Sequence, residues 1–155
     1  MKKISLLLIA GIMACSLQSC DPGFHDDMYL TNELSNPVLC IYMSDTTTLN
    51  PNEEKMFFHM GGIGHSIFDN YYDDVFYFFP IKIVFNDSLS ISYEAENIAL
   101  FEKTTLKKSS WEVVEHEGSS RNSSLKAVYT IDEEDYHNAL VQCGYEQEGI
   151  DYLGL

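Results

Sequence analysis

Two histidines and three aspartates fall within sixteen residues in the middle of the chain: His59, His65, Asp69, Asp73 and Asp74. Imidazole and carboxylate are ligands that zinc and related ions accept, and two histidines with one aspartate would suffice. Their spacing matches no established metal motif, and the simpler interpretation is that Asp69 caps a helix while the others face solvent. The sequence therefore predicts no metal site. His59, His65 and Asp69 are the candidates that a metal-assisted hydrolase would need.

Two further arrangements could support catalysis. Residues 64–68 begin like the nucleophile elbow of a serine hydrolase, but Phe68 stands where that motif needs its second glycine. Glu112 and Glu115 could act as a glycosidase pair, although that chemistry needs a separation of about 5–10 Å, which spacing alone does not set. We interpret Ser66 as a loop serine and predict no catalytic residue.

Aromatic residues gather at 57–58, 71–72 and 76–79. Such a group could stack against sugars on an exposed surface, but large aromatic side chains more often build the core of a small domain. The core interpretation is favoured.

Two cysteines lie well inside the chain, Cys40 in a strand-like apolar run and Cys143 on the apolar face of an expected helix. A disulfide between them would suit an exported protein. Free buried thiols are equally common in such positions. Both alternatives stay open.

The first twenty residues have the zones of a secretory leader. Lys2 and Lys3 precede an apolar run over residues 4–17, which is too short to span a bilayer comfortably. The run ends in Leu17-Gln18-Ser19-Cys20, with a small residue directly before a cysteine. Cys15 also follows a small residue, but Cys20 follows a longer apolar run and precedes turn-prone residues.

This order resembles the lipobox recognised by prolipoprotein signal peptidase. The resemblance implies cleavage between Ser19 and Cys20 and fatty acylation of Cys20, which would anchor the chain to a membrane. The expected organisation is a signal peptide over 1–19, a lipidated tether over 20–27 and one domain over 28–155.

Charge limits the partners of the mature chain. Removing the leader takes away two lysines and no acid, so seven basic and 24 acidic residues remain, a formal charge of −17. Nucleic acid and anionic lipid are disfavoured because both are polyanions. A basic protein would be attracted.

Alternating and β-branched patterns predict six strands. They cover residues 38–43, 55–59, 81–85, 89–93, 111–116 and 125–131. The glycines at 61–64 are expected to break the chain, and the polar segment 117–124 is expected to be a mobile loop.

Two helices are expected. One covers 69–79, with a strand over 75–79 as the alternative. The other starts at Asp132, which would cap it, and ends at Gly144. Its apolar stripe would be Tyr136, Ala139, Leu140 and Cys143. The three acids that follow Asp132 complement the positive charge at the start of the helix, so we do not interpret them as metal ligands. The fold class is therefore all-β to α+β: a small β-sandwich or bent antiparallel sheet with one or two helices, including a C-terminal helix.

The lipobox, the turn at 49–53 and the stretch at 129–136 resemble features of small lipoproteins of unknown function from anaerobic gut bacteria. The resemblance implies no active site and no cofactor. Asp21, Asp26 and Asp27 resemble the acidic signal that exports such proteins to the cell surface, whereas an aspartate directly after the cysteine also resembles an inner-membrane retention signal. We therefore expect a lipid-anchored envelope protein that binds a protein or glycan without catalysis. The alternatives are an immunity-type lipoprotein that binds a basic toxin and an envelope metal-assisted hydrolase.

Overall fold

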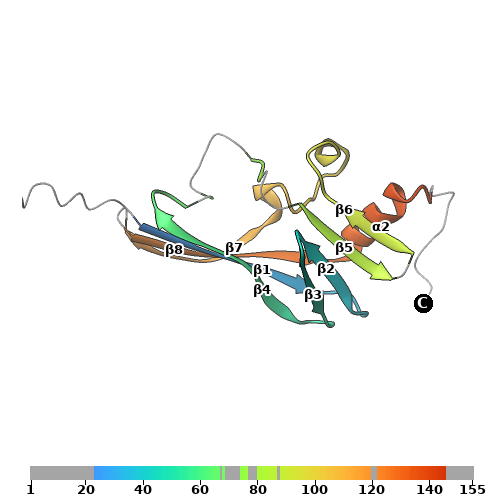
Figure 1. The fold of residues 1–155 in the computed structure, drawn as a ribbon, viewed down its shortest axis with the longest axis horizontal. Helices are drawn as coiled ribbons and strands as arrows, with labels where there is room; N and C mark the ends of the chain where they lie inside the picture. The colour runs from blue at the N-terminus through green and yellow to red at the C-terminus, as the bar shows by residue number, and fades with distance from the viewer. Residues whose placement is uncertain are drawn as a thin grey trace, which may run out of the picture.

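The computed structural model describes residues 23–66, 68, 74–76, 80–86, 88–119 and 122–145. Over these residues the chain forms two four-stranded β-sheets and one α-helix near its C-terminal end (Figure 1). The expected β-rich fold with a C-terminal helix is confirmed.

The first sheet has the strand order β4-β1-β8-β7. Its strands are β1 (Gly23–Asn32), β4 (Glu54–Ile63), β7 (Glu112–Ser119) and β8 (Asn122–Ile131). The two central strands, β1 and β8, run parallel, and each edge strand is antiparallel to its neighbour.

The second sheet is antiparallel, with the order β3-β2-β5-β6. Its strands are β2 (Val38–Tyr42), β3 (Asp45–Leu49), β5 (Ile81–Asn86) and β6 (Leu89–Ser92). Two short 3₁₀ turns, η1 (Ile98–Leu100) and η2 (Lys108–Ser110), lie between β6 and β7, and helix α2 (Glu133–Gln142) follows β8.

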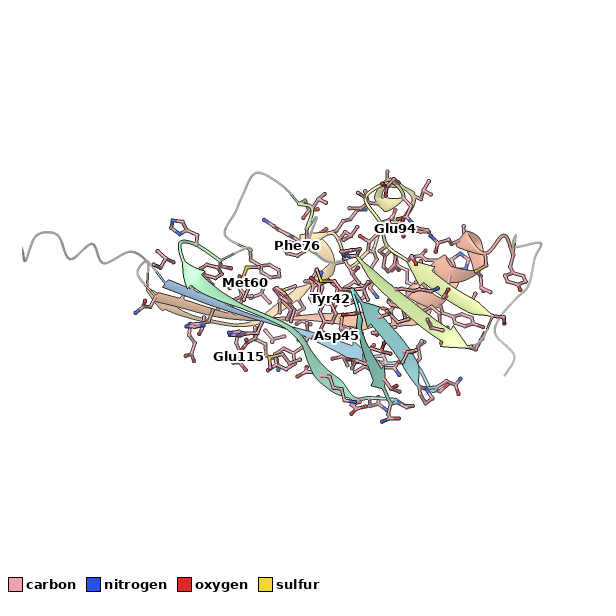
Figure 2. The ribbon with its side chains drawn as sticks, viewed as in Figure 1. Tyr42, Asp45, Met60, Phe76, Glu94 and Glu115 are labelled. Atoms are coloured by element: carbon pink, nitrogen blue, oxygen red, sulfur yellow. The ribbon has the colours of Figure 1, made fainter. Side chains whose placement is uncertain are left out.

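The core lies between the sheets and follows the two-residue period of a strand. Alternate residues of β1 and β8 point inward, and Met28, Leu30 and Tyr129 are fully buried. Ile83 and Ile91 meet them from the second sheet. The opposite face of the first sheet is polar: Glu115 lies there, on the other side of the sheet from Phe76 and Tyr42 (Figure 2).

Two expectations about strands β1 and β4 are wrong. Residues 23–27 are not a tether but the first half of β1, paired on both sides. The glycines do not end β4, because Gly61 and Gly62 stay in the strand and lie against the side chains of His25 and Phe24. A Cβ at Gly61 would lie 2.7 Å from Nδ1 of His25, so the glycine leaves room for this ring.

The expected loop at 117–124 is instead the end of a hairpin. β7 continues to Ser119 and β8 begins at Asn122. Gly118 permits the turn, because it has a φ of +123° and a Cβ would lie 2.0 Å from the backbone oxygen of Asn122. Only glycine adopts that backbone without strain.

The expected helix over 69–79 falls mostly outside the described residues. Within 74–76 the backbone is not helical: Val75 forms an isolated bridge with Lys107, and Phe76 is buried. Its expected cap, Asp69, lies outside the described residues.

The C-terminal helix begins as expected. Asp132 accepts a hydrogen bond from the backbone of Glu134, and Asp135 completes a capping box. Gly144 has a φ of +78° just beyond the last turn. Of the expected stripe, Ala139 is buried but Cys143, just after the last turn, is exposed.

Candidate functional site

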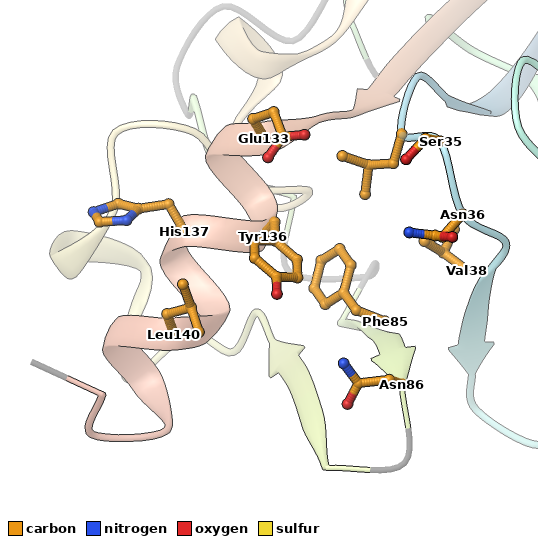
Figure 3. A pocket seen from close by; sticks show the side chains of 10 residues that line it. Ser35, Asn36, Val38, Phe85, Asn86, Glu133, Tyr136, His137 and Leu140 are labelled. Carbon is orange, nitrogen blue, oxygen red and sulfur yellow. The ribbon is translucent and has the colours of Figure 1, made fainter. Parts of the chain in front are cut away.

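A groove of about 1000 Å³ lies between helix α2, the start of β2 and the end of β5 (Figure 3). Five apolar side chains and five polar ones line it. The apolar ones are Leu34, Val38, Phe85, Tyr136 and Leu140; the polar ones are Ser35, Asn36, Asn86, Glu133 and His137.

Two aromatic rings form the centre of the groove. Tyr136 comes from the helix and Phe85 from β5, and their rings meet edge to face with centroids 5.4 Å apart. Both rings are partly exposed. They give a ligand an apolar surface with defined geometry.

Amides lie across the groove from the helix. Figure 3 shows Asn36 and Asn86 on the strand side, facing the side that carries Tyr136. The Oδ1 atom of Asn86 accepts hydrogen bonds from the backbone of Ser88 and Leu89, which fixes the orientation of this amide. Glu133 and His137 add a carboxylate and an imidazole from the helix.

Asn32, fully buried at the end of β1, holds the loop that forms one wall. Its Nδ2 atom donates to the backbone oxygens of Asn36 and Leu49, at 2.9 and 3.1 Å. Its Oδ1 atom accepts from the backbone of Leu34 at 3.0 Å. One side chain therefore fixes three points of the backbone around the groove.

Asp135, also fully buried, holds the helical wall. The hydroxyls of Tyr93 and Tyr129 each donate to its Oδ1 atom at 2.5 Å. Lys103 donates to its Oδ2 atom at 2.9 Å and also pairs with Asp132 at 2.8 Å. The network ties the first turn of α2 to the residue directly after β6, to β8 and to the segment before β7.

Burial sets the protonation of the groups around Asp135. Burial first, and the charge of Asp135 second, raise the pKa of Tyr93 and of Tyr129 above the usual range. The same two causes raise the pKa of the Cys40 thiol from 9.0 to about 12. These three groups are therefore neutral at physiological pH, and the tyrosines remain hydrogen-bond donors.

Three polar groups of the groove stand apart from one another. In the part of the chain that the structure describes, Ser35, Glu133 and His137 make no hydrogen bonds to one another. A nucleophile activated by a base needs such a contact. An apolar floor with separate polar groups around it is typical of a ligand site.

The predicted metal candidates are not brought together. His59 bonds to Asp27 at 2.6 Å on the open face of the first sheet and stacks on His25 with centroids 5.8 Å apart. His65 is exposed beyond the end of β4, and Asp69 is outside the described residues. Within the described ranges, no three histidine, cysteine, aspartate or glutamate side chains are grouped to hold a metal.

Cys40 and Cys143 are free in the structure, so the disulfide that the sequence left open is not formed. Cys40 is buried in β2, whereas Cys143 is exposed after the helix, with its thiol 3.6 Å from the backbone oxygen of Ser90. The lipid-attachment residue Cys20 and the cleavage residue Ser19 lie outside the described residues.

The other residues that the sequence singled out for chemistry lie outside the groove. Ser66 is buried and donates to Asp26 at 3.0 Å. Glu112 and Glu115 are exposed on β7. Phe57 packs edge to face on Tyr42 at 4.9 Å, so the first aromatic group belongs to the packing between the sheets.

No protein-family model, curated protein or solved structure matches this chain. Among the described residues, no helix has the length and apolar character needed to cross a membrane.

Sequence reasoning missed the groove. It placed Tyr136 in a core stripe and did not consider Asn36 or Phe85. The groove forms where the ends of β1, β5 and β8 come together. A local sequence pattern does not predict which distant segments pack against each other. The turn-rich run Asn32-Glu33-Leu34-Ser35-Asn36-Pro37 was the available signal, because asparagines in a loop often bond to the backbone.

Proposed function

We propose that this chain is a lipid-anchored envelope protein whose single domain binds an uncharged polar ligand, such as a neutral glycan, without catalysis. The groove beside α2 is the observation that carries the proposal. Its volume lies at the upper end of the range for small-ligand sites.

The chemistry of the groove supports a ligand that has both apolar and polar faces. The Tyr136 and Phe85 rings offer a surface for the apolar face of a sugar, and Asn36, Asn86 and Glu133 offer hydrogen-bond partners for its hydroxyls. The acidic body disfavours an anionic ligand.

A glycan array with the mature protein tests the groove, and two tyrosine variants sharpen the test. Tyr136→Ala removes the ring in the groove, and we expect binding to weaken about tenfold or more, since that loss is ~1.4 kcal/mol. Tyr145→Ala removes a tyrosine that is exposed after the helix and does not line the groove. We expect this variant to bind as the unchanged protein does.

Circular dichroism of both variants separates loss of binding from loss of folding. Equal binding by the two folded variants, or an array with no ligand, would contradict a glycan-binding groove.

The leader supports the anchor, since residues 17–20 resemble a lipobox. Growth with an alkyne-tagged fatty acid should label the unchanged protein but not Cys20→Ala. Labelling of both variants to the same extent would place the modification elsewhere.

Charge favours a second candidate, an immunity-type lipoprotein that binds a basic protein such as a toxin. The mature chain carries 24 acids against seven basic residues, and Glu112, Glu115 and Glu117 are exposed along the edge strand β7. Such binding should weaken steeply between low and physiological salt, whereas glycan binding in the groove should not.

A further inference from the structure

The end of the first sheet nearest to Cys20 differs from the rest of the molecule. Gly23 pairs with Ile63 and with Asn122, and Asn122 pairs with Ser119, so all four strands share this end. We call it the anchor-side end. It comprises the two outermost rows of the sheet together with Gly64, and its residues are Gly23, Phe24, Gly62, Ile63, Gly64, Gly118, Ser119, Asn122 and Ser123.

None of these nine described residues carries a charge, although the mature chain has 31 charged residues; residues 120–121, which join Ser119 to Asn122 and include Arg121, lie outside the described residues. The first acid on these strands, Glu117, stands in the third row, opposite Ser124. Ile63 is 77% exposed at the corner of the sheet, so its side chain is free to contact a surface next to this end.

Chain length places this end close to Cys20. Two residues, Asp21 and Pro22, separate Cys20 from Gly23. A fully extended chain spans at most ~3.6 Å per Cα-to-Cα step, so these three steps cover at most about 11 Å. A lipid on Cys20 would enter the hydrocarbon layer, and the anchor-side end would then lie within reach of the lipid headgroups.

We propose that the anchor-side end of the first sheet is a membrane-contacting surface, which rests against the lipid headgroups with Ile63 inserted among them. This inference rests on the proposed anchor at Cys20 and deepens it. The lack of charge matters because acids here would be repelled by lipid phosphates, and Ile63 gains by leaving water.

The same geometry sets the direction of the groove. β1 is 10 residues long, so its far end is about 30 Å from Gly23. Leu34 and Asn36 line the groove just beyond that end, and α2 lies at the opposite end of the long axis from the start of β1 (Figure 1). An anchored domain in this orientation presents its groove away from the membrane.

Hydrogen–deuterium exchange on vesicles tests this orientation. The mature chain, with Cys143→Ser to remove its exposed thiol, is coupled through Cys20 to a maleimide phospholipid in phosphatidylcholine and phosphatidylethanolamine vesicles. We expect backbone amides at 62–64 and 118–119 to exchange at least about tenfold more slowly on vesicles than in solution. Amides of the groove loop at 33–37 should exchange equally in both.

Ile63→Glu should remove this protection, because it adds a charge at the inserted corner. The matched control is Leu100→Glu, which changes a residue of similar exposure, 76%, on η1 and should keep the protection. Unchanged exchange at 62–64, or protection at the groove loop instead, would overturn the proposal.

Chemical coupling keeps this test separate from the proposed function. If cells do not acylate Cys20, fatty-acid labelling fails while the coupled protein still reports which end meets lipid. If cells do acylate Cys20 but the domain has no preferred orientation, labelling succeeds while exchange at 62–64 and 118–119 is the same on vesicles as in solution.

Discussion

At the scale of single residues, the buried carboxylate of Asp135 does more than complement the positive end of α2, which is the role that the sequence predicts for it. Asp135 completes the capping box, but it also accepts two tyrosine hydroxyls and pairs with Lys103. Its four donors are Tyr93, directly after β6, Tyr129 in β8, Lys103 in the segment before β7 and the backbone of Asp132. The groove keeps its helical wall because this one side chain is fully satisfied.

Asp135→Asn tests that role. The substitution removes the charge opposite Lys103 and places an amide donor among donors, so we expect the free energy of unfolding to fall by about 3 kcal/mol. Urea unfolding followed by tryptophan fluorescence measures it. Glu134→Gln changes an exposed acid in the same turn and should alter stability by less than ~0.5 kcal/mol. Similar losses in both variants would mean that Asp135 acts only through helix charge.

Alkaline pH should weaken the fold through the neutral groups around Asp135. In the unfolded chain the Cys40 thiol ionises near its ordinary pKa of 9.0, whereas the folded protein keeps it protonated up to about 12. The folded state therefore binds more protons than the unfolded state in this window, and stability falls as pH rises from about 9 to about 12.

Tyr93 and Tyr129 act in the same direction, because their raised pKa values also delay ionisation in the folded state. Cys40→Val should make the decline between pH 9 and 12 shallower, by up to ~1.4 kcal/mol per pH unit. Urea midpoints at successive pH values measure the slope. Identical slopes with and without the thiol would contradict this explanation.

At the scale of elements, the groove depends on how loops leave the strands. Asn32→Ala removes the side chain that fixes the loop after β1 and leaves buried backbone groups of Leu34 and Leu49 without a partner. We expect a loss of about 2–3 kcal/mol and faster amide exchange at 33–37. Asn50→Ala removes an exposed amide that bonds Glu53 and should cost much less. If amide exchange at 33–37 stays unchanged, the loop is held by something other than Asn32.

The hairpin of β7 and β8 depends on one glycine. Gly118→Ala combines a positive φ with a Cβ 2.0 Å from the Asn122 oxygen, so the turn must shift, at a cost of about 1–3 kcal/mol. Gly144 also has a positive φ, but open space surrounds it, so Gly144→Ala should cost ~1 kcal/mol or less. Thermal unfolding of both variants gives the comparison. Equal losses would show that backbone strain alone, without the clash, sets the cost.

Sequence patterns predicted elements whose signal is local. Runs rich in β-branched and aromatic residues gave β2, β5, β6 and β8, and Asp132 gave the start of α2. The patterns failed where a distant partner decides the conformation. β1 contains polar residues such as His25 and Asp27, and it is a strand because β4 and β8 pair with it on both sides.

The same limit applies to the candidate sites. His59 and His65 are close in sequence, but β4 places His59 beside Asp27 while His65 lies past the strand end. Asn36, Phe85 and Tyr136 are far apart in sequence, and the packing of α2 beside β5 brings them together. Spacing along the chain could not predict that groove. It also could not show that the end of β4 separates His59 from His65.

At the scale of the whole molecule, the two proposed surfaces lie at opposite ends of its long axis. The uncharged anchor-side end adjoins Cys20, and the groove opens beyond the other ends of β1 and β8. The described acidic residues lie outside the anchor-side end, and their charge favours solubility and repels an anionic membrane.

The anchor-side contact and the outward direction of the groove both depend on acylation of Cys20. The most direct test is the intact mass of the protein extracted from the membranes of cells that make it. We predict a chain that begins at residue 20 and carries the added mass of a diacylglyceryl group and an N-acyl group. An unmodified chain that keeps residues 1–19 would contradict the anchor and the orientation derived from it.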